Sequence, residues 1–355
     1  MKIISIVGAR PNFIKLAPLS REIRKSFEEV IVHTGQHYNY EMDKIFFQDL
    51  GIHEPDYHLG VGSGTHGHQT GEMIKRIEDV LIKEEPDMVL DFGDTNTTLA
   101  GAIAAVKLHI KVAHVEAGLR SYDKKMPEEV NRVLVDHCSA MLFCPTETAV
   151  ENLRREGIVA GVYLTGDVMV DSLEYSMKIA EKKSRILNDL GLKPKEYYLA
   201  TVHRAENTDD SEKLGRIVEA LCEAGTVVFP CHPRTEKLLN RFGLWGELQE
   251  NVKIIRPIGY FDMLMLEKNA KKILTDSGGV QKEAYILGVP GITLRENTEW
   301  VETVTDGWNV LVGTRKDEII RAISEFEPEK GQRDVFGRGD ASRNIASIIA
   351  NSYLY

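Results

Sequence analysis

Strand patterns alternate with helix patterns along the whole chain, and no other feature of the sequence restricts the possible folds as strongly. Short apolar runs typical of buried strands occur in the first half at 3–7, 30–32, 88–92, 112–115 and 141–144. The pattern restarts in the second half, with runs at 198–202, 227–229, 252–255, 271–275 and 291–294. Because such alternation forms parallel sheets covered by helices on both faces, the sequence predicts an α/β fold with two sheets.

The chain is long enough for about two domains, and the restart of the alternation indicates where they divide. A long helix pattern runs from Val168 to about Leu190, so we place the first domain at 1–167 and the second at 168–338. The segment 57–69 is rich in Gly and His and has no periodicity, which predicts a mobile loop.

The composition argues against several classes of partner. With 54 acidic and 44 basic residues the net charge is −10, so no broad basic surface is available for nucleic acid or an anionic membrane. No apolar run approaches a membrane span, and the N-terminus enters a strand without a signal-peptide pattern, so we expect a cytoplasmic protein. The four cysteines form no CxxC pair, and we expect no metal site.

One stretch in the second half has the form of an anion-binding turn. The strand pattern at 271–275 leads into a glycine turn and then an amphipathic helix. Ser277, Gly278 and Gly279 let the backbone approach a ligand, and free N–H groups at a helix N-terminus face an anion. Glu283 lies one turn into the helix, where its carboxylate can accept hydrogen bonds from ribose hydroxyls. A tight connection without a ligand is the alternative, and the pattern alone does not choose between them.

Polar residues gather just after the strand ends in both halves. In open parallel sheets, ligands bind outside the carboxyl ends of the strands, so these residues mark a candidate site. With two sheets, we expect the site in a cleft between the domains, each domain giving one wall. The residues in such positions are Arg10, Lys15, Gln36, His37, Asp94, Glu116, Arg120, His203, Arg204, His232 and Ser277.

Several of these positions carry basic side chains. Arg10 and Lys15 lie at the start of a helix, where cations oppose the dipole unless an anion binds there; the alternative is that both reach into solvent. His203 and Arg204 follow the first strand of the second half, where they can bind phosphate or donate a proton. His232 follows a later strand and forms a second histidine position of the same kind.

The carboxylates each have a structural alternative. Asp94 can cap the next helix, and Glu116 can pair with Arg120. Glu128 lies in the first turn of a helix, where a carboxylate suits the dipole. Carboxylates at the ends of adjacent elements are nevertheless what acid–base catalysis at a carbon centre requires, because such chemistry needs more than one of them.

Three common nucleotide and hydrolase motifs are missing from the sequence. No GxGxxG follows the first strand, and neither GxxxxGK[ST] nor GxSxG occurs. NAD-dependent, P-loop and hydrolase functions therefore lose their main support, and we expect no cofactor.

Short motifs extend over nearly the whole chain in a defined order. They are Gly8-Ala9-Arg10-Pro11 with Lys15, Thr34-Gly35-Gln36-His37, Gly93-Asp94-Thr95, Val115-Glu116-Ala117-Gly118-Leu119-Arg120, Pro127-Glu128-Glu129 with Asn131-Arg132, Pro145-Thr146-Glu147, His203-Arg204, and Asp276-Ser277-Gly278-Gly279 with Glu283. Together they resemble the UDP-N-acetylglucosamine 2-epimerase family. The resemblance implies two Rossmann-like domains of the glycosyltransferase-B type with an interdomain cleft, a homodimer, and a C-terminal helix at 339–355 that packs back on the first domain.

Inversion at C2 of the sugar makes a definite chemical demand. The C2 hydrogen is not acidic, because C1 is an acetal rather than a carbonyl, so inversion needs transient oxidation or elimination of the group on C1. Oxidation requires a nicotinamide site, which the sequence lacks. Elimination requires a base, stabilisation of departing UDP, and a second acid–base group on the other face of the glycal. The carboxylates and basic residues suit elimination, which interconverts UDP-N-acetylglucosamine and UDP-N-acetylmannosamine.

The resemblance assigns roles to the candidate residues. The catalytic residues are Asp94, Glu116, Glu128 and His203, the last stabilising or protonating the leaving pyrophosphate. The substrate-binding residues are Arg10, Lys15, Arg204, His232, Ser277, Gly278, Gly279, Glu283 and Arg295. In some relatives a second substrate molecule activates the enzyme, and the matching allosteric residues here are Gln36 and His37.

The sequence departs from the family pattern at one place. Many relatives read Thr-Glu-Arg-Pro-Glu where this chain has Trp300 and Val301 in place of the Arg-Pro pair, and Arg295 nearby is a candidate substitute for the arginine. Three other functions compete with the epimerase: a hydrolysing epimerase, a glycosyltransferase of the same fold, and a sugar-nucleotide sensor without enzymatic activity.

Overall fold

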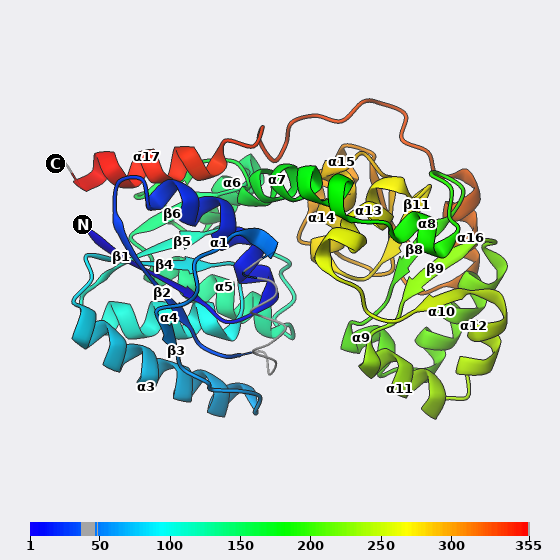
Figure 1. Cartoon of the computed structure of the whole chain (residues 1–355), viewed down its shortest axis with the longest axis horizontal. Helices are drawn as coiled ribbons and strands as arrows, with labels where there is room; N and C mark the ends of the chain where they lie inside the picture. Colours follow the sequence, from blue (N-terminus) through cyan, green and yellow to red (C-terminus); the bar gives the residue numbers. More distant parts are fainter. Residues whose placement is uncertain (37–46, 48, 354–355) are drawn as a thin grey trace. The chain divides into compact units, whose positions relative to one another are not determined.

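The computed structural model describes residues 1–36, 47 and 49–353. The chain forms two compact units, each with its own sheet (Figure 1). Unit 1 comprises Met1–Glu174 and Asp334–Tyr355, and unit 2 comprises Tyr175–Arg333. The domain limits predicted from the sequence, 1–167 with 339–355 and 168–338, stay a prediction beside this division.

Unit 1 contains a seven-stranded sheet in which every neighbouring pair of strands is parallel, in the order β3-β2-β1-β4-β5-β6-β7. The strands are β1 (Lys2–Val7), β2 (Glu28–His33), β3 (Tyr57–His58), β4 (Met88–Phe92), β5 (Lys111–Val115), β6 (Met141–Cys144) and β7 (Val162–Leu164). The direction of the strand order reverses between β1 and β4. From β1, the strands β2 and β3 continue toward one edge of the sheet, whereas β4 to β7 continue toward the other. Ligands bind at such a switch point in open α/β sheets.

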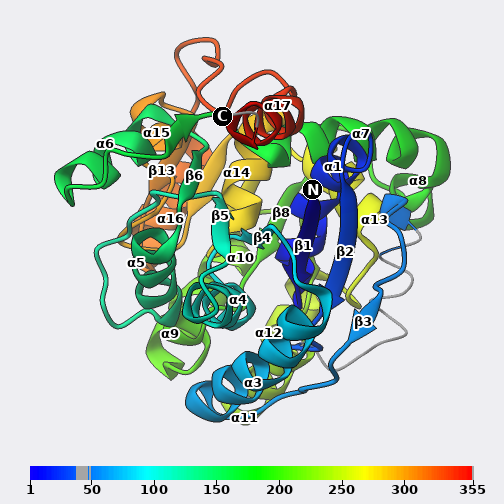
Figure 2. The same cartoon turned by 90° about the vertical axis from the view of Figure 1, so that its left-hand side faces the viewer.

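Helices cover both faces of this sheet. They are α1 (Arg10–Ile23), α3 (His66–Glu84), α4 (Asn96–Lys107), α5 (Pro127–Cys138), α6 (Glu147–Arg155), α7 (Val168–Lys183) and the C-terminal α17 (Ala341–Tyr353). Helices α3, α4 and α5 pack side by side under one face, and α17 lies along α1 on the other, as Figures 1 and 2 both show. The apolar side chains of α3 and α4 form one core with those of β1, β2 and β4, which holds the carboxyl ends of these strands in register.

Unit 2 contains a six-stranded parallel sheet in the order β10-β9-β8-β11-β12-β13. Its strands are β8 (Tyr198–Thr201), β9 (Val227–Pro230), β10 (Lys253–Ile255), β11 (Lys272–Thr275), β12 (Gly291–Thr293) and β13 (Asn309–Leu311). Its helices are α8 (Ile186–Leu190), α9 (Ala205–Thr208), α10 (Ser211–Glu223), α11 (Pro233–Arg241), α12 (Trp245–Asn251), α13 (Tyr260–Asn269), α14 (Gly278–Ile286), α15 (Val301–Thr305) and α16 (Lys316–Glu325). Two apolar cores, each containing side chains of β8, β9 and β11, bury most of the middle of the sheet.

The predicted fold class, α/β with parallel sheets, is confirmed, while two local predictions are wrong. The segment 57–69 is not one loop, because Tyr57–His58 pair with β2 and α3 already begins at His66. The helix predicted from Val168 to about Leu190 is interrupted at 184–185 and forms α7 and α8. In the part of the chain that the structure describes, no helix combines the length and the apolar character needed to cross a membrane.

Candidate active site

In unit 1, the loops after β4 and β5 bring two of the predicted carboxylates to neighbouring positions. Asp94 follows β4 and Glu116 follows β5, and these strands are direct neighbours in the sheet. Gly93, which directly precedes Asp94, has φ +67. A Cβ at that position would lie 2.7 Å from the Lys15 ammonium and 3.4 Å from Glu116 Oε1. The loop before Asp94 therefore passes directly over the Lys15–Glu116 pair, and glycine is needed there.

Glu116 is a buried, ion-paired carboxylate on a strained backbone. Its φ of +76 is unusual for a residue other than glycine, and such strain concentrates at functional sites. The ammonium of Lys15 lies 2.5 Å from Glu116 Oε1, and both side chains are less than a tenth exposed. Two structural alternatives from the sequence are thereby wrong: Lys15 does not reach into solvent, and Arg120 pairs with Asp136 and Glu156 rather than serving as the ion-pair partner of Glu116.

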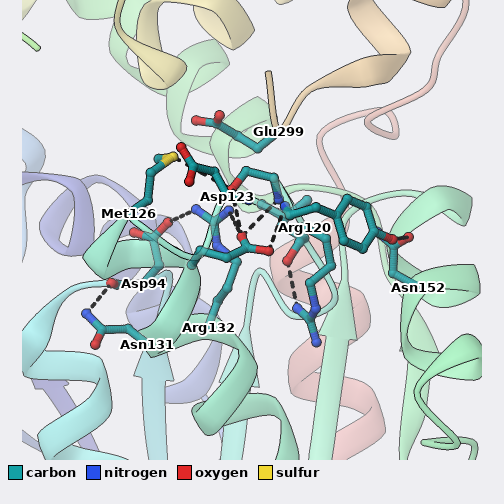
Figure 3. Close-up of polar contacts among 12 residues, drawn as sticks. Asp94, Arg120, Asp123, Met126, Asn131, Arg132, Asn152 and Glu299 are labelled. Atoms are coloured by element: carbon teal, nitrogen blue, oxygen red, sulfur yellow. Dashed lines mark hydrogen bonds and ion pairs between the residues drawn. The ribbon is translucent and has the colours of Figure 1, made fainter. Parts of the chain in front are cut away.

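Asp94 is held from α5 and does not cap a helix. Thr95 is the N-cap of α4 and accepts a hydrogen bond from the Thr98 amide, so the capping role proposed for Asp94 is wrong. The Asn131 amide donates to the Asp94 backbone carbonyl at 2.9 Å, and Arg132 forms an ion pair with the Asp94 carboxylate (Figure 3). The carboxylate remains 28% exposed, so it is fixed in position and still accessible to a ligand.

Of the adjacent Glu128 and Glu129, the structure buries the second. Glu129 accepts hydrogen bonds from the amides and hydroxyl of Ser121 and Tyr122 at 2.8–2.9 Å and pairs with Arg132 at 2.9 Å. Glu128, the predicted catalytic residue, is half-buried. Its side chain makes no hydrogen bond or ion pair with any residue in the described ranges. Glu129 therefore shapes the site, whereas the Glu128 carboxylate is available to a substrate.

Two of the remaining unit 1 candidates lie in the described residues: Arg10, whose side chain is exposed, and Gln36, whose side-chain amide is hydrogen-bonded. Arg10 is exposed at the first position of α1. Gln36 Oε1 accepts from the backbone amide and hydroxyl of Thr97, at 3.1 and 2.8 Å, so its side chain lies against the start of α4. The second allosteric candidate, His37, lies outside the described residues. An allosteric role for these two residues stays a prediction.

In unit 2, the turn after β11 and the loop after β8 are joined by a buried carboxylate that the sequence analysis did not single out. Asp276 is fully buried and accepts hydrogen bonds from the backbone amides of His203 and Arg204 at 3.0–3.1 Å. The Asn207 side chain also donates to it, at 3.2 Å. Asp276 thus fixes the two residues predicted to bind phosphate beside the turn that begins at Ser277.

His203 belongs to a basic cluster at this edge of the sheet. Burial of the ring in its surroundings lowers the pKa of His203, and the nearby charges of Arg204, His232 and Arg234 lower it further, whereas Asp276 raises it. The imidazole nevertheless keeps 46% of its surface exposed. His232 lies at the N-cap of α11, where its Nδ1 accepts from the Arg234 amide at 3.2 Å. Arg204 pairs with Glu299 at 3.8 Å and Arg234 with Asp209 at 2.7 Å. Both guanidinium groups keep part of their surface exposed, and guanidinium groups are good phosphate ligands.

The glycine turn has the geometry predicted from the sequence. Ser277 is the N-cap of α14, and its hydroxyl accepts from the Val280 amide at 3.5 Å. A Cβ at Gly278 would lie 2.0 Å from the Glu299 carboxylate, so only glycine fits there, while Gly279 is exposed. Glu283, one turn into α14, is buried and accepts a hydrogen bond from the Tyr260 hydroxyl at 3.1 Å.

The place where the family arginine is lost has a different arrangement of charge. Arg295, the proposed substitute, is buried and bonds to Glu299 and Asn297 at 3.0 Å and to Glu206 at 3.3 Å. The ammonium of Lys282 lies 4.1 Å from the ring centre of Trp300, and both side chains are buried. Cation–π contact with a desolvated indole is worth roughly 2 kcal/mol or more. The cation beside Trp300 is therefore supplied from α14.

The described residues include no group of three or more His, Cys, Asp or Glu side chains arranged to hold a metal ion. A family model for UDP-N-acetylglucosamine 2-epimerase matches residues 21–350 of the chain. The chain belongs to the UDP-N-acetylglucosamine 2-epimerase family. The predicted fold class, two Rossmann-like domains of the glycosyltransferase-B type, is that of the solved members and their structural neighbours.

Close relatives cover this epimerase-family chain from end to end. A UDP-N-acetylglucosamine 2-epimerase homolog of Methanococcus maripaludis is 59% identical over 99% of the chain and its own full length. The UDP-2,3-diacetamido-2,3-dideoxy-D-glucuronate 2-epimerase of Pseudomonas aeruginosa is 48% identical, with 99% of each chain covered. The solved UDP-GlcNAc 2-epimerase of Methanocaldococcus jannaschii, in complex with UDP-GlcNAc and UDP, is 49% identical and superposes with a TM-score of 0.92 over 99% of this chain and all of its own.

Proposed function

We propose that the protein is a non-hydrolysing 2-epimerase that interconverts UDP-N-acetylglucosamine and UDP-N-acetylmannosamine. The observation that carries the proposal is the pair of carboxylates, Asp94 and Glu116, at the ends of adjacent strands and each held by a cation. Family membership and end-to-end similarity to named epimerases support the same reaction. A homodimer in the cytoplasm is our expectation for the assembled enzyme, and light scattering tests its dimeric state.

The chemistry proceeds by elimination and re-addition. A carboxylate removes the C2 proton, the C2–H electron pair forms the C1–C2 double bond, and the C1–O bond breaks with its electrons passing to UDP. The diphosphate then attacks C1 of the glycal, and a proton is delivered to the opposite face of C2. Asp94, Glu116 and Glu128 are the acid–base groups of unit 1, and the ion pairs with Arg132 and Lys15 hold the first two in position.

The residues of unit 2 bind the leaving group in this proposal. The amides of the Ser277–Gly279 turn at the N-terminus of α14 donate hydrogen bonds to a phosphate. The Arg204 guanidinium, which pairs with Glu299 against Gly278, adds a second phosphate contact. Glu283 accepts from the ribose, and His232 and Arg295 complete the nucleotide side. Burial chiefly lowers the pKa of His203, which favours the neutral ring; an arriving diphosphate favours its cationic form, which can then protonate or stabilise departing UDP.

A second substrate is favoured by one comparison. The Pseudomonas aeruginosa relative is a 2-epimerase for a UDP-diacetamidouronate, and its identity of 48% is close to that of the M. jannaschii enzyme at 49%. Both sugars carry an acetamido group at C2, so the same elimination serves either. We therefore name UDP-2,3-diacetamido-2,3-dideoxy-D-glucuronate as the second candidate. Product formation from each UDP-sugar under identical conditions distinguishes them.

Proton NMR of UDP-N-acetylglucosamine with the purified protein in deuterated buffer tests the reaction. The epimerase incorporates deuterium at C2 and forms the manno product while the C1–UDP bond is retained. Free N-acetylmannosamine with UDP would instead indicate a hydrolysing epimerase, and transfer of labelled sugar to an acceptor a glycosyltransferase. A raised melting temperature with no change in the sugar over hours would indicate a sensor.

A further inference from the structure

A chain of buried charged side chains runs beneath the carboxylates of unit 1, and the proposed chemistry does not use it. Asp136 on α5 pairs with His114 on β5 at 2.7 Å and with Arg120 at 2.7 Å. Arg120 continues to Glu156 through two parallel hydrogen bonds of 2.7 Å. The side chains of His114, Asp136 and Arg120 are at most 1% exposed. Burying so many charges is expensive unless every group is paired, and apolar side chains would serve stability as well.

Each ring nitrogen of His114 has a hydrogen-bond partner. Its Nε2 lies 2.7 Å from the carbonyl oxygen of Gly93, which can only accept. Its Nδ1 lies 2.7 Å from Asp136 Oδ1. Burial alone would raise the pKa of Asp136, but the hydrogen bonds and charges of His114 and Arg120 outweigh it and lower that pKa, so this carboxylate is ionised and also only accepts. Both ring nitrogens of His114 therefore face groups that only accept, an arrangement that a doubly protonated ring satisfies and that neither neutral tautomer satisfies fully.

This network reaches both loops that carry the catalytic carboxylates. The His114 ring holds the Gly93 carbonyl, which belongs to the peptide bond leading into Asp94. Asp136 Oδ2 accepts from the Gly118 amide at 3.1 Å and from Arg120, so it holds the loop that begins at Glu116. Asp136 lies one turn after Arg132 on α5, and Arg132 binds the Asp94 side chain. One helix thus fixes both loops.

We propose that Asp136 and His114 are positioning residues for the epimerisation, holding the Asp94 and Glu116 loops at the spacing that proton transfer on the two faces of C2 requires. The inference rests on the proposed function, because it assumes that these carboxylates move the C2 proton. A displacement of about 1 Å between reacting groups can reduce a rate by about 100-fold. The competing explanation is a network that only stabilises unit 1.

The test compares Asp136→Asn with Asp91→Asn. Asp91 is a matched control, because it is another fully buried carboxyl of unit 1, the register partner of His114 on β4, and outside the network. For Asp136→Asn we expect kcat to fall about 10- to 100-fold with KM nearly unchanged, and the isotope effect with C2-deuterated substrate to rise because C–H cleavage becomes slower relative to other steps. Asp91→Asn should retain wild-type kcat and isotope effect. If Asp136→Asn loses activity only in proportion to its unfolded fraction, with the wild-type isotope effect, the positioning role is overturned.

A second measurement does not depend on activity and so separates this inference from the proposed function. In ¹⁵N-histidine spectra of the wild-type protein, His114 should show two protonated ring nitrogens protected from solvent exchange, and His114→Gln identifies the signals by their loss. A neutral tautomer would overturn the charge assignment and the inference with it, whatever the enzyme catalyses. Should the wild-type protein exchange no deuterium at C2, the proposed function fails while the imidazolium signature still reports on the network.

Discussion

The carboxylates at the strand-end edges of the two units have different kinds of partner. In unit 1, Glu116 and Asp94 are each neutralised by a side-chain cation, Lys15 and Arg132. In unit 2, the fully buried Asp276 is instead neutralised by backbone amides and one side-chain amide. The side-chain cations hold the unit 1 carboxylates in a fixed orientation. The arginines at the unit 2 edge pair with other carboxylates, Arg204 with Glu299 at 3.8 Å and Arg234 with Asp209 at 2.7 Å, so Asp276 does not take up their charge. The difference supports our proposal that acid–base chemistry takes place at the first edge and phosphate binding at the second.

The largest effect is expected from Asp94→Asn, which tests the first half of the comparison. Asparagine keeps an oxygen that accepts from Arg132, so the fold should persist, but it cannot exchange a proton. Loss of an acid–base group typically lowers a rate by about 100- to 10,000-fold. Turnover measured by NMR should therefore nearly vanish, while calorimetric titration should give nearly unchanged UDP affinity.

The control for this prediction is Glu283→Gln in unit 2. It removes a charge that is proposed to accept from the ribose and should weaken UDP binding more than it alters the maximal rate. If Asp94→Asn and Glu283→Gln lose nucleotide affinity equally, the division of roles between the two edges is wrong.

A smaller effect is expected from Asp276→Asn, which tests the second half. The side-chain NH₂ would face backbone N–H donors, so His203 and Arg204 lose their fixed position. Leaving such buried donors without an acceptor costs about 1–3 kcal/mol, and more when the acceptor was charged. We expect UDP affinity and the free energy of unfolding to fall together, measured by calorimetry and urea titration. Asp210→Asn is the control, because asparagine caps α10 as well as aspartate does; an equal loss there would contradict the prediction.

Another carboxyl, that of Asp91, has neither a side-chain cation nor an amide as a hydrogen-bond donor among the described residues. Asp91 on β4 is fully buried, and neither oxygen has a hydrogen-bond partner among the described residues. Burial raises the pKa of Asp91 well above its ordinary value, so the group is protonated in the folded protein. Since its pKa in the folded state exceeds that in the unfolded state, stability is greatest below the unfolded value and declines as the pH rises through it.

Asp91→Asn should therefore stabilise the protein at neutral pH. Asparagine has nearly the same shape as aspartate and therefore fits the same space. That space is tight, because a Cβ at Gly101 would lie 2.2 Å from the Asp91 carboxyl. We expect a gain of about 1–3 kcal/mol at pH 7 that disappears below about pH 4, measured by urea unfolding across this range. A gain that is the same at both pH values would show that ionisation of Asp91 is not its source.

The sequence predicted the strand ends and the glycine turn, but not the residues that hold them. Alternating patterns are local, so the strands before Asp94, Glu116 and Ser277 could be recognised from short windows. The partners come from elsewhere in the chain: Arg132 reaches Asp94 across 38 positions, and Lys15 reaches Glu116 across 101. Helical spacing offered one signal, since residues 129, 132 and 136 fall on one face of α5. Nothing in the sequence around Lys15 indicated that its side chain is buried, because a lysine at the start of a helix can equally well reach into solvent.

The smallest predicted effect concerns the pH dependence of UDP binding at the unit 2 edge. The pKa of His203 is lowered, chiefly by burial and further by the neighbouring cations, so the ring is neutral at pH 7. A bound diphosphate adds negative charge and raises that pKa, so binding takes up a proton and affinity increases as the pH falls toward the pKa of the free ring. At most this gives about a tenfold change per pH unit. Titration in buffers of different ionisation enthalpy measures the proton uptake, and His203→Gln should abolish it while Asp94→Asn leaves it unchanged. Equal proton uptake by wild type and His203→Gln would place the titrating group elsewhere and weaken the assignment of leaving-group protonation to this edge.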